Sequence, residues 1–261
     1  MDANLRREND WLALTGLFWL QKGFNTFGSS RDCDILLPKR APHLIGAFEF
    51  DGTDNIVLHI EMGQTGELNG IPIQTNAVLK TDHGDPPSLI TFEELRLLVI
   101  QRGDRFGVYI WDNLRSQRSE FPPRNWFPLG EKYRITGKYV PYILPIKVDL
   151  SNSFGEPEND IMLGYVTFKI GDKTCKLDAT ELNDGCLFLQ FKDLTNGEKT
   201  YPSGRYINTE AVSEDGQVLL DFNKSFNPPS AFTDYAICTF ASKSNHLNLA
   251  IEAGELYVRP R

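Results

Sequence analysis

Short runs of β-branched and aromatic residues, separated by turn residues about every ten positions, dominate this sequence. NIVLHIEM at 55–62, LRLLVIQ at 95–101 and FGVYIWD at 106–112 are examples. Turn signals such as Asn69-Gly70 and Gly-Asp-Arg at 103–105 lie between such runs. Because each run is long enough for one strand and too short for a long helix, the pattern predicts an all-β fold.

The same pattern returns in the second half of the chain. IMLGYVTFKIGDKTCKLDATEL at 161–182 predicts a β-hairpin with its turn at 171–172. QVLLDFN at 217–223 and LNLAIEAGEL at 247–256 predict further strands. We therefore expect antiparallel strands on both sides of the middle of the chain.

The β-rich pattern is interrupted once, by a segment rich in Pro, Arg and aromatic residues that begins at residue 113. Linkers that remain disordered seldom contain Phe, Trp and Tyr at this density. We therefore expect a first β module over 1–112, an ordered connector over 113–145, and a second β domain over 146–261.

The longest apolar run, WLALTGLFWL at 11–20, has about half the length needed to cross a bilayer. Arg6 and Arg7 precede it, as in an export signal, but so do Glu8 and Asp10, and no small-residue cleavage pattern follows. We expect an amphipathic N-terminal helix that packs on the first module, with no membrane segment and a cytoplasmic location.

The composition argues against several classes of partner. The net charge is −8, so the clustered Lys and Arg of a nucleic-acid-binding surface are not expected. The four cysteines form no C-x-x-C pair and the four histidines share no ligand spacing, so neither a metal site nor a cofactor is predicted. Cys175 and Cys186 could form a disulfide across a hairpin, but two reduced thiols are favoured in a cytoplasmic protein.

One polar segment, DFNKSFNPPSAF at 221–232, follows an apolar strand and precedes an aromatic run. Pro228 and Pro229 fix φ and prevent continued ladder pairing, so a rigid excursion of the chain is expected there. Asp and Asn side chains can satisfy main-chain groups in such a loop. The segment is therefore either a rigid turn or the floor of a pocket.

In the second interpretation a group of polar and aromatic residues surrounds one pocket. Arg supplies a planar fork for a carboxylate or phosphate, and Asn, Asp and Tyr supply polar contacts and apolar walls. The candidate ligand-binding residues are Arg205, Tyr206, Asp221, Asn223, Asn227, Tyr235, Asn245 and Glu255. Arg205 and Asp221 could equally form an internal ion pair.

Two hypotheses for function follow from these residues. The first is non-catalytic binding of a small polar or anionic molecule, or of a protein partner segment. The site would be formed by the GRY motif at 204–206 and the DFN-NPP motif at 221–229. The alternative is a hydrolase or lyase in which Asp221 or Glu255 acts as acid or base and Arg205 anchors the substrate. No nucleophile–base pair or cofactor motif favours the alternative.

Several motifs resemble one bacterial family. They are LTGLFWLQKGFNTFGSSRDCDILLP at 14–38, RNWFPLGEKYRITGKYVPY at 124–142, FKDLTNGEKTYPSGRY at 191–206 and VLLDFNKSFNPPSAFTDYAICTF at 218–240. Together they identify the chain as similar to the family called domain of unknown function 1684. The family pattern commonly has cysteine where this chain has Ser230, while its second cysteine is present as Cys238. The loss of the first cysteine therefore argues against a thiol-based mechanism here.

The first module also resembles a forkhead-associated (FHA) sandwich, through FGSSRDCDILLP and the later LNG at 68–70. The resemblance would imply phosphothreonine binding through an Arg, a Ser, a His and an Asn. Here Gly28-Ser29 replaces the Gly-Arg turn and APHLIGAF at 41–48 replaces the Ser-x-x-His segment, so only Asn69-Gly70 matches. Without the Arg, a phosphate loses its bidentate partner, and a scaffold without that site is expected.

Overall fold

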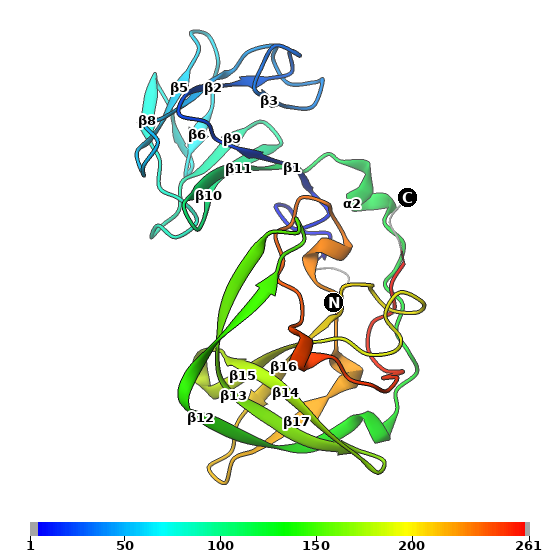
Figure 1. Ribbon diagram of the computed structural model, residues 1–261. Helices are drawn as coiled ribbons and strands as arrows, with labels where there is room; N and C mark the ends of the chain where they lie inside the picture. Colours follow the sequence, from blue (N-terminus) through cyan, green and yellow to red (C-terminus); the bar gives the residue numbers. More distant parts are fainter. Residues whose placement is uncertain (1–4, 259–261) are drawn as a thin grey trace. The chain divides into compact units, whose positions relative to one another are not determined.

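The computed structural model describes residues 5–258. They form two compact units, one ending at Phe121 and the other beginning at Pro122. Strands make up most of the regular structure and the helical elements are all short, so the predicted all-β fold class is confirmed (Figure 1). No helix among the described residues is long and apolar enough to span a membrane.

The first unit packs two sheets against each other around one apolar core, which includes Phe27, Phe48, Leu58, Leu97 and Val108. The six-stranded sheet has the order β1 (Leu14–Trp19), β11 (Arg105–Asp112), β10 (Leu95–Arg102), β9 (Leu89–Phe92), β6 (Glu67–Leu68) and β7 (Ile71–Pro72). The five-stranded sheet has the order β3 (Ile35–Leu36), β2 (Gly23–Gly28), β4 (Gly46–Phe50), β5 (Ile56–Ile60) and β8 (Asn76–Val78). Alternating burial along β4 and β5 turns one face of each strand to the core.

The N-terminal helix predicted over residues 11–20 is wrong. Residues 11–13 form a turn, and strand β1 pairs antiparallel with β11. Thr15, Phe18 and Trp19 favour a strand, and Gly16 weakens a helix at its centre. A Cβ at Gly16 would lie 2.9 Å from the Phe18 ring and 3.4 Å from Ile110, so the glycine allows the close packing of β1 on β11.

The second unit contains one six-stranded antiparallel sheet. Its order is β16 (Arg205–Ala211), β15 (Cys186–Phe191), β14 (Lys173–Glu181), β13 (Pro157–Ile170), β12 (Arg134–Ser151) and β17 (Gln217–Asp221). The end strands β16 and β17 contact each other, so the sheet curls around a core that includes Leu177, Phe191, Leu220 and Phe222 (Figure 1). The hairpin predicted over 161–182 is confirmed as β13 and β14, and the strand predicted at 217–223 as β17.

The structure of this half of the chain differs from the expected one in two segments. Strand β12 begins at Arg134, inside the segment expected to be a connector as far as residue 145. That segment also contains the short helix α2 (Ser116–Glu120) and the 3-10 turn η1 (Glu131–Tyr133). Residues 247–256 form no strand, because they run beside residues 192–194 with only scattered main-chain hydrogen bonds.

Residues 122–133, which we name the strap, lie along the C-terminal segment of the second unit. Phe127 N–H donates to the carbonyl of Gly254, and Leu256 N–H donates to the carbonyl of Asn125. An isolated antiparallel bridge joins Trp126 to Glu255 between them. These contacts hold the strap against the C-terminal segment.

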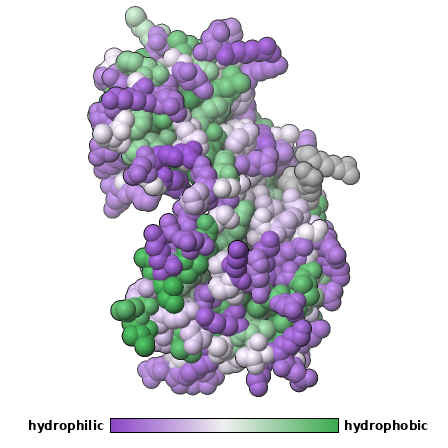
Figure 2. Space-filling model, in the orientation of Figure 1, coloured by the Kyte–Doolittle hydropathy of each residue, from purple (hydrophilic) through white to green (hydrophobic). Residues whose placement is uncertain are grey.

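Hydrophilic residues occupy much of the visible surface of each unit, and apolar residues form smaller patches (Figure 2). This distribution is expected when most large apolar side chains are gathered in two cores. Ile143 and Leu144 of β12 are among the apolar side chains that remain exposed. Cys175 and Cys186 are both free thiols, so they form no disulfide.

Candidate functional site

Arg205, the candidate anchor, is completely buried at the start of β16. Its Nη2 donates to Asp193 Oδ2 at 2.5 Å and to the carbonyl of Ile251 at 3.0 Å, and its Nη1 donates to the carbonyl of Ala253. Its Nε has no partner among the described residues. The ion-pair partner is therefore Asp193 and not Asp221. Both terminal nitrogens of the guanidinium already donate to groups of the protein.

Asp193 is also completely buried, and its carboxylate is held from a second side. Its Oδ1 accepts from the Thr195 N–H at 2.7 Å and from the Thr195 hydroxyl at 2.6 Å. Burial lowers the pKa of Arg205, and the adjacent carboxylate opposes that effect. Both charges are thus paired inside the protein, as a buried ion pair requires.

Glu255, the candidate acid or base, forms a bidentate pair with Arg124 of the strap. Arg124 Nε and Nη2 donate to Glu255 Oε1 and Oε2, each at 2.6 Å, and the Glu255 side chain is 1% exposed. The main-chain N–H of Asn227 donates to Oε2 at 2.8 Å. A carboxylate held by these donors joins the strap to the turn at residues 227–229, which we name the NPP turn.

Asn227 and Asn223 fasten the same region. Asn227 Nδ2 donates to the carbonyl of Leu256 at 3.1 Å. Asn223 exchanges two hydrogen bonds with the main chain of Gly130 in the strap and donates to Asp221 Oδ1 at 2.9 Å. Asp221 also caps the short turn after β17 by accepting from the Asn223 N–H. DFNKSFNPPSAF therefore forms the rigid turn that was one of its two interpretations.

The two candidate tyrosines have different surroundings. The Tyr206 hydroxyl donates to the carbonyl of Thr239 at 2.6 Å, and burial raises the Tyr206 pKa far above its ordinary value. Tyr235 is half-buried, and its N–H donates to the Thr233 hydroxyl at 3.4 Å. Neither ring lines any of the cavities described among these residues.

Asn245 lies between strands β14 and β15. Its Oδ1 accepts from the N–H of Asp178 at 2.7 Å, and its Nδ2 donates to the carbonyls of Asp178 at 2.9 Å and Gln190 at 2.8 Å. The side chain therefore takes the place of direct pairing between the two strands, which form a ladder only at Thr180 and Glu181.

The structure thus brings Arg205, Asn227 and Glu255 into one buried network around Ser225. The Ser225 hydroxyl lies 3.4 Å from Arg205 Nη1, and the Ser225 carbonyl accepts from the Glu255 N–H. Asn245 lies apart from this network, at the β14–β15 gap. Two partners were missed by sequence reasoning, Asp193 and Arg124; the signals available for them were the KDLTNG and PPRNW segments.

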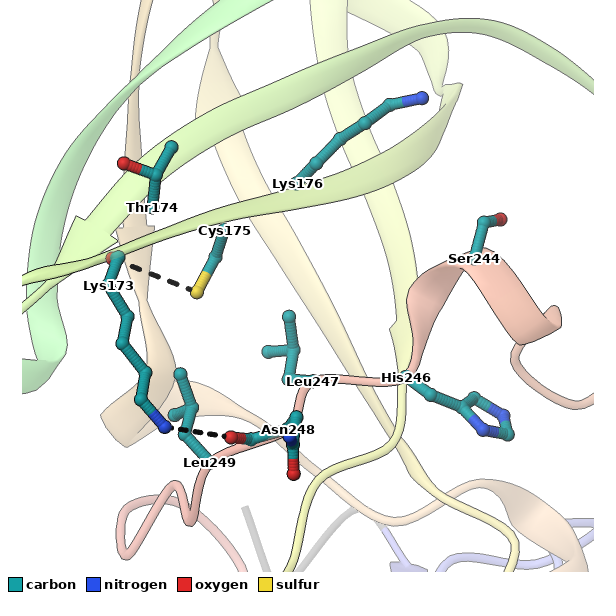
Figure 3. A pocket seen from close by; sticks show the side chains of 9 residues that line it. All are labelled: Lys173, Thr174, Cys175, Lys176, Ser244, His246, Leu247, Asn248 and Leu249. Carbon is teal, nitrogen blue, oxygen red and sulfur yellow. Dashed lines mark hydrogen bonds between the residues drawn. The ribbon is translucent and has the colours of Figure 1, made fainter.

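We name the three side-chain hydrogen bonds of Asn245 to β14 and β15 the Asn245 bridge. An open pocket with a volume of about 540 Å³ lies next to it. Cys175, Leu247 and Leu249 turn toward one another in it, while the side chains of Lys176 and His246 point away from these three (Figure 3). Lys173, Ser244 and Asn248 also line the pocket. Lys173 Nζ donates to the carbonyl of Asn248 at 3.1 Å. The pocket therefore has an apolar floor and a cationic rim.

A polar cluster centred on Asp178 borders this pocket. Asp178 accepts from the hydroxyls of Ser244 at 2.6 Å and Tyr142 at 2.7 Å, and it lies 3.0 Å from Lys176 Nζ. Burial raises the pKa of Asp178, but these three contacts outweigh it and the pKa is lowered. Burial lowers the pKa of Lys176, but Tyr142 and Asp178 outweigh it, so Lys176 remains an ammonium group.

Cys238 is the remaining thiol of interest. Burial raises its pKa, and hydrogen bonding with Ser230 opposes that effect only in part. A buried thiol with a raised pKa is a poor nucleophile. Among residues 5–258, no group of His, Cys, Asp and Glu side chains is arranged to hold a metal ion.

The family model described as "Protein of unknown function (DUF1684)" matches residues 119–256, which is more than half of the chain. The chain belongs to this family. The DUF1684 match includes the strap, the buried network, the Asn245 bridge and all eight candidate residues. Residues 1–118 lie outside it.

A solved structure is similar to part of this DUF1684 protein. It is the solution NMR structure of an uncharacterized protein from Haloarcula marismortui, with 26% identity over 54% of this chain and 80% of that chain, and a TM-score of 0.44. No curated protein matches the chain.

Arg205→Met tests the structural role of the buried pair. The substitution leaves the Asp193 carboxylate buried without its cation, which costs about 3–5 kcal/mol in the free energy of unfolding. Urea denaturation followed by far-UV circular dichroism measures the loss. Lys199→Met, which removes the exposed pair with Glu252, is the control and should leave the midpoint near wild type. Equal midpoints for the two variants would contradict the role given to Arg205.

Asn245→Ala and Asn248→Ala form a matched pair in one segment. Loss of Asn245 leaves the N–H of Asp178 and the carbonyl of Gln190 without their partner, and each unsatisfied buried group costs about 1–3 kcal/mol. Asn248 is exposed, so its replacement should have little effect. Hydrogen exchange of the Asp178 amide reports the change, and unaltered protection in Asn245→Ala would show that the bridge is dispensable.

Proposed function

We propose that the C-terminal unit is a non-catalytic binding module that takes a small polar or anionic ligand in the pocket beside Asn245. The observation that carries this proposal is the cationic rim, with Lys173 and Lys176, beside an apolar floor. Ligand pockets commonly combine apolar walls with a few placed polar groups. The rim contrasts with the net charge of −8 of the whole chain.

The site differs from the one expected at the GRY and DFN-NPP motifs. There Arg205 and Glu255 are already saturated by internal charge partners, so a ligand would have to break a buried pair. At the pocket, Lys173 is exposed and its ammonium contacts only a carbonyl oxygen among the contacts described. Lys173 can therefore turn to an anion at little cost.

We further propose that the first unit is an FHA-like scaffold without the phosphate site, and that the protein acts in the cytoplasm. The packing of a six-stranded on a five-stranded sheet supports the first statement. Four free thiols support the second. The enzyme hypothesis gains no support, because Glu255 is locked by Arg124 and Asp221 serves as a cap.

Titration of the ¹⁵N-labelled protein with citrate tests the binding proposal. Amide shifts are expected at residues 173–176 and 244–249. Lys173→Met should weaken binding by a factor on the order of five or less, since an exposed charge pair contributes up to about 1 kcal/mol. Lys147→Met, at an exposed position on β12, is the matched control and should leave the affinity unchanged.

Two results would contradict the proposal. One is the absence of shifts in the two segments as citrate is added. The other is equal weakening by Lys173→Met and Lys147→Met, which would mean that only the overall charge of the protein matters.

A further inference from the structure

Strand β14 has one edge that the sheet does not use. Its residues 173–179 all pair with β13 on one side. On the other side β14 forms a ladder with β15 only at Thr180 and Glu181. The remaining part of that edge faces the pocket beside Asn245, which is lined by residues 173–176.

The direction of the main-chain groups along this edge follows from Asp178. Its N–H and its carbonyl both contact Asn245, so both point away from β13. In an antiparallel ladder, alternate residues point their main-chain groups the same way. The N–H and carbonyl groups of Lys176 and Thr174 therefore also point away from β13, toward the pocket. No contact described for residues 5–258 satisfies them.

We infer that the ligand of this pocket is an extended, acidic peptide segment that adds to the free edge of β14 as a strand. This inference rests on the proposed binding function and names its ligand class. Main-chain hydrogen bonds provide affinity in strand addition, and alternate side-chain contacts provide specificity. An unpaired edge next to a cavity is the surface that such a segment requires.

The two faces of β14 specify the pattern of the segment. Cys175 and Leu177 lie on the buried face, and Thr174 and Lys176 on the outer face. An added strand continues the same two faces, so its side chains alternate between the apolar floor and the cationic rim. Apolar residues fit beside Cys175 and Leu247, and an acidic residue on the outer face fits beside Lys176. Lys173 lies on the same face as Cys175, at the end of the strand, where it can meet an acidic group at the end of the segment.

The length of the segment is also limited. Asn245 occupies the edge at Asp178, and the hairpin turn ends the strand before Lys173. The open edge therefore spans residues 173–177, and about five residues of a partner can pair with it. A small anion such as citrate would contact the rim but would not need the free N–H groups.

The probe is a fluorescent pentapeptide of alternating Glu and Val, acetylated and amidated at its ends, measured by fluorescence anisotropy with the full chain. Thr174→Pro removes the edge N–H of residue 174 and leaves the β13 ladder intact, because that N–H faces away from β13. Thr174→Ala keeps the N–H and is the control. We expect Thr174→Pro to weaken peptide binding about fivefold or more, since at least one hydrogen bond is lost. Thr174→Ala should bind as wild type does.

A second probe makes the test independent of the variant's folding. The same peptide with N-methylated amides on its pairing edge keeps its charge but cannot donate hydrogen bonds, so wild-type protein should bind it weakly. Equal binding of the two peptides, or equal binding by Thr174→Pro and Thr174→Ala, would overturn strand addition. If citrate still binds in that case, the anion-binding proposal survives; if neither peptide nor citrate binds, both proposals fail.

Discussion

The C-terminal unit depends on the burial of one charge pair, Arg205 and Asp193. Two ions inside a core are tolerated only when their remaining donors and acceptors are also bonded. Asp193 fixes the turn at Thr195, and Arg205 draws in the carbonyls of Ile251 and Ala253. Since residues 247–256 form no strand, these bonds to a guanidinium replace the ladder that would otherwise hold the segment against the sheet.

A second pair extends the same principle to the strap. Glu255 follows the carbonyls that Arg205 binds, and it receives Arg124 from a segment far away in the sequence. The NPP turn adds the Asn227 N–H to the same carboxylate. The two arginines thus place three irregular segments, the strap, the NPP turn and the C-terminal segment, around one buried network. All three segments lie within the residues that match DUF1684.

The sequence predicted regular strands well and irregular segments poorly, for a physical reason. The hairpin of β13 and β14 follows from alternation and a Gly-Asp turn, which are local signals. Residues 11–20 have an apolar pattern that is compatible with a helix. Strand β1 forms there instead because it pairs with the edge of β11. Arg205 was identified as an anchor, but whether its fork faces a ligand or Asp193 depends on a contact across a turn that no local pattern encodes.

Asn245 is predicted from the sequence to contact a ligand, but its side chain instead bonds two strands beside the pocket. Its amide donates to both β14 and β15 and also accepts from β14, so the two strands cannot pair directly at that level. Beyond Asn245, residues 247–249 run beside residues 192–194, so the edge of β14 is unpaired at residues 173–177 and the pocket lies there. A gap fixed by three buried hydrogen bonds is already formed before a ligand arrives. Pre-organisation of this kind lowers the entropy cost of binding, because the main-chain donors of the edge are already aligned.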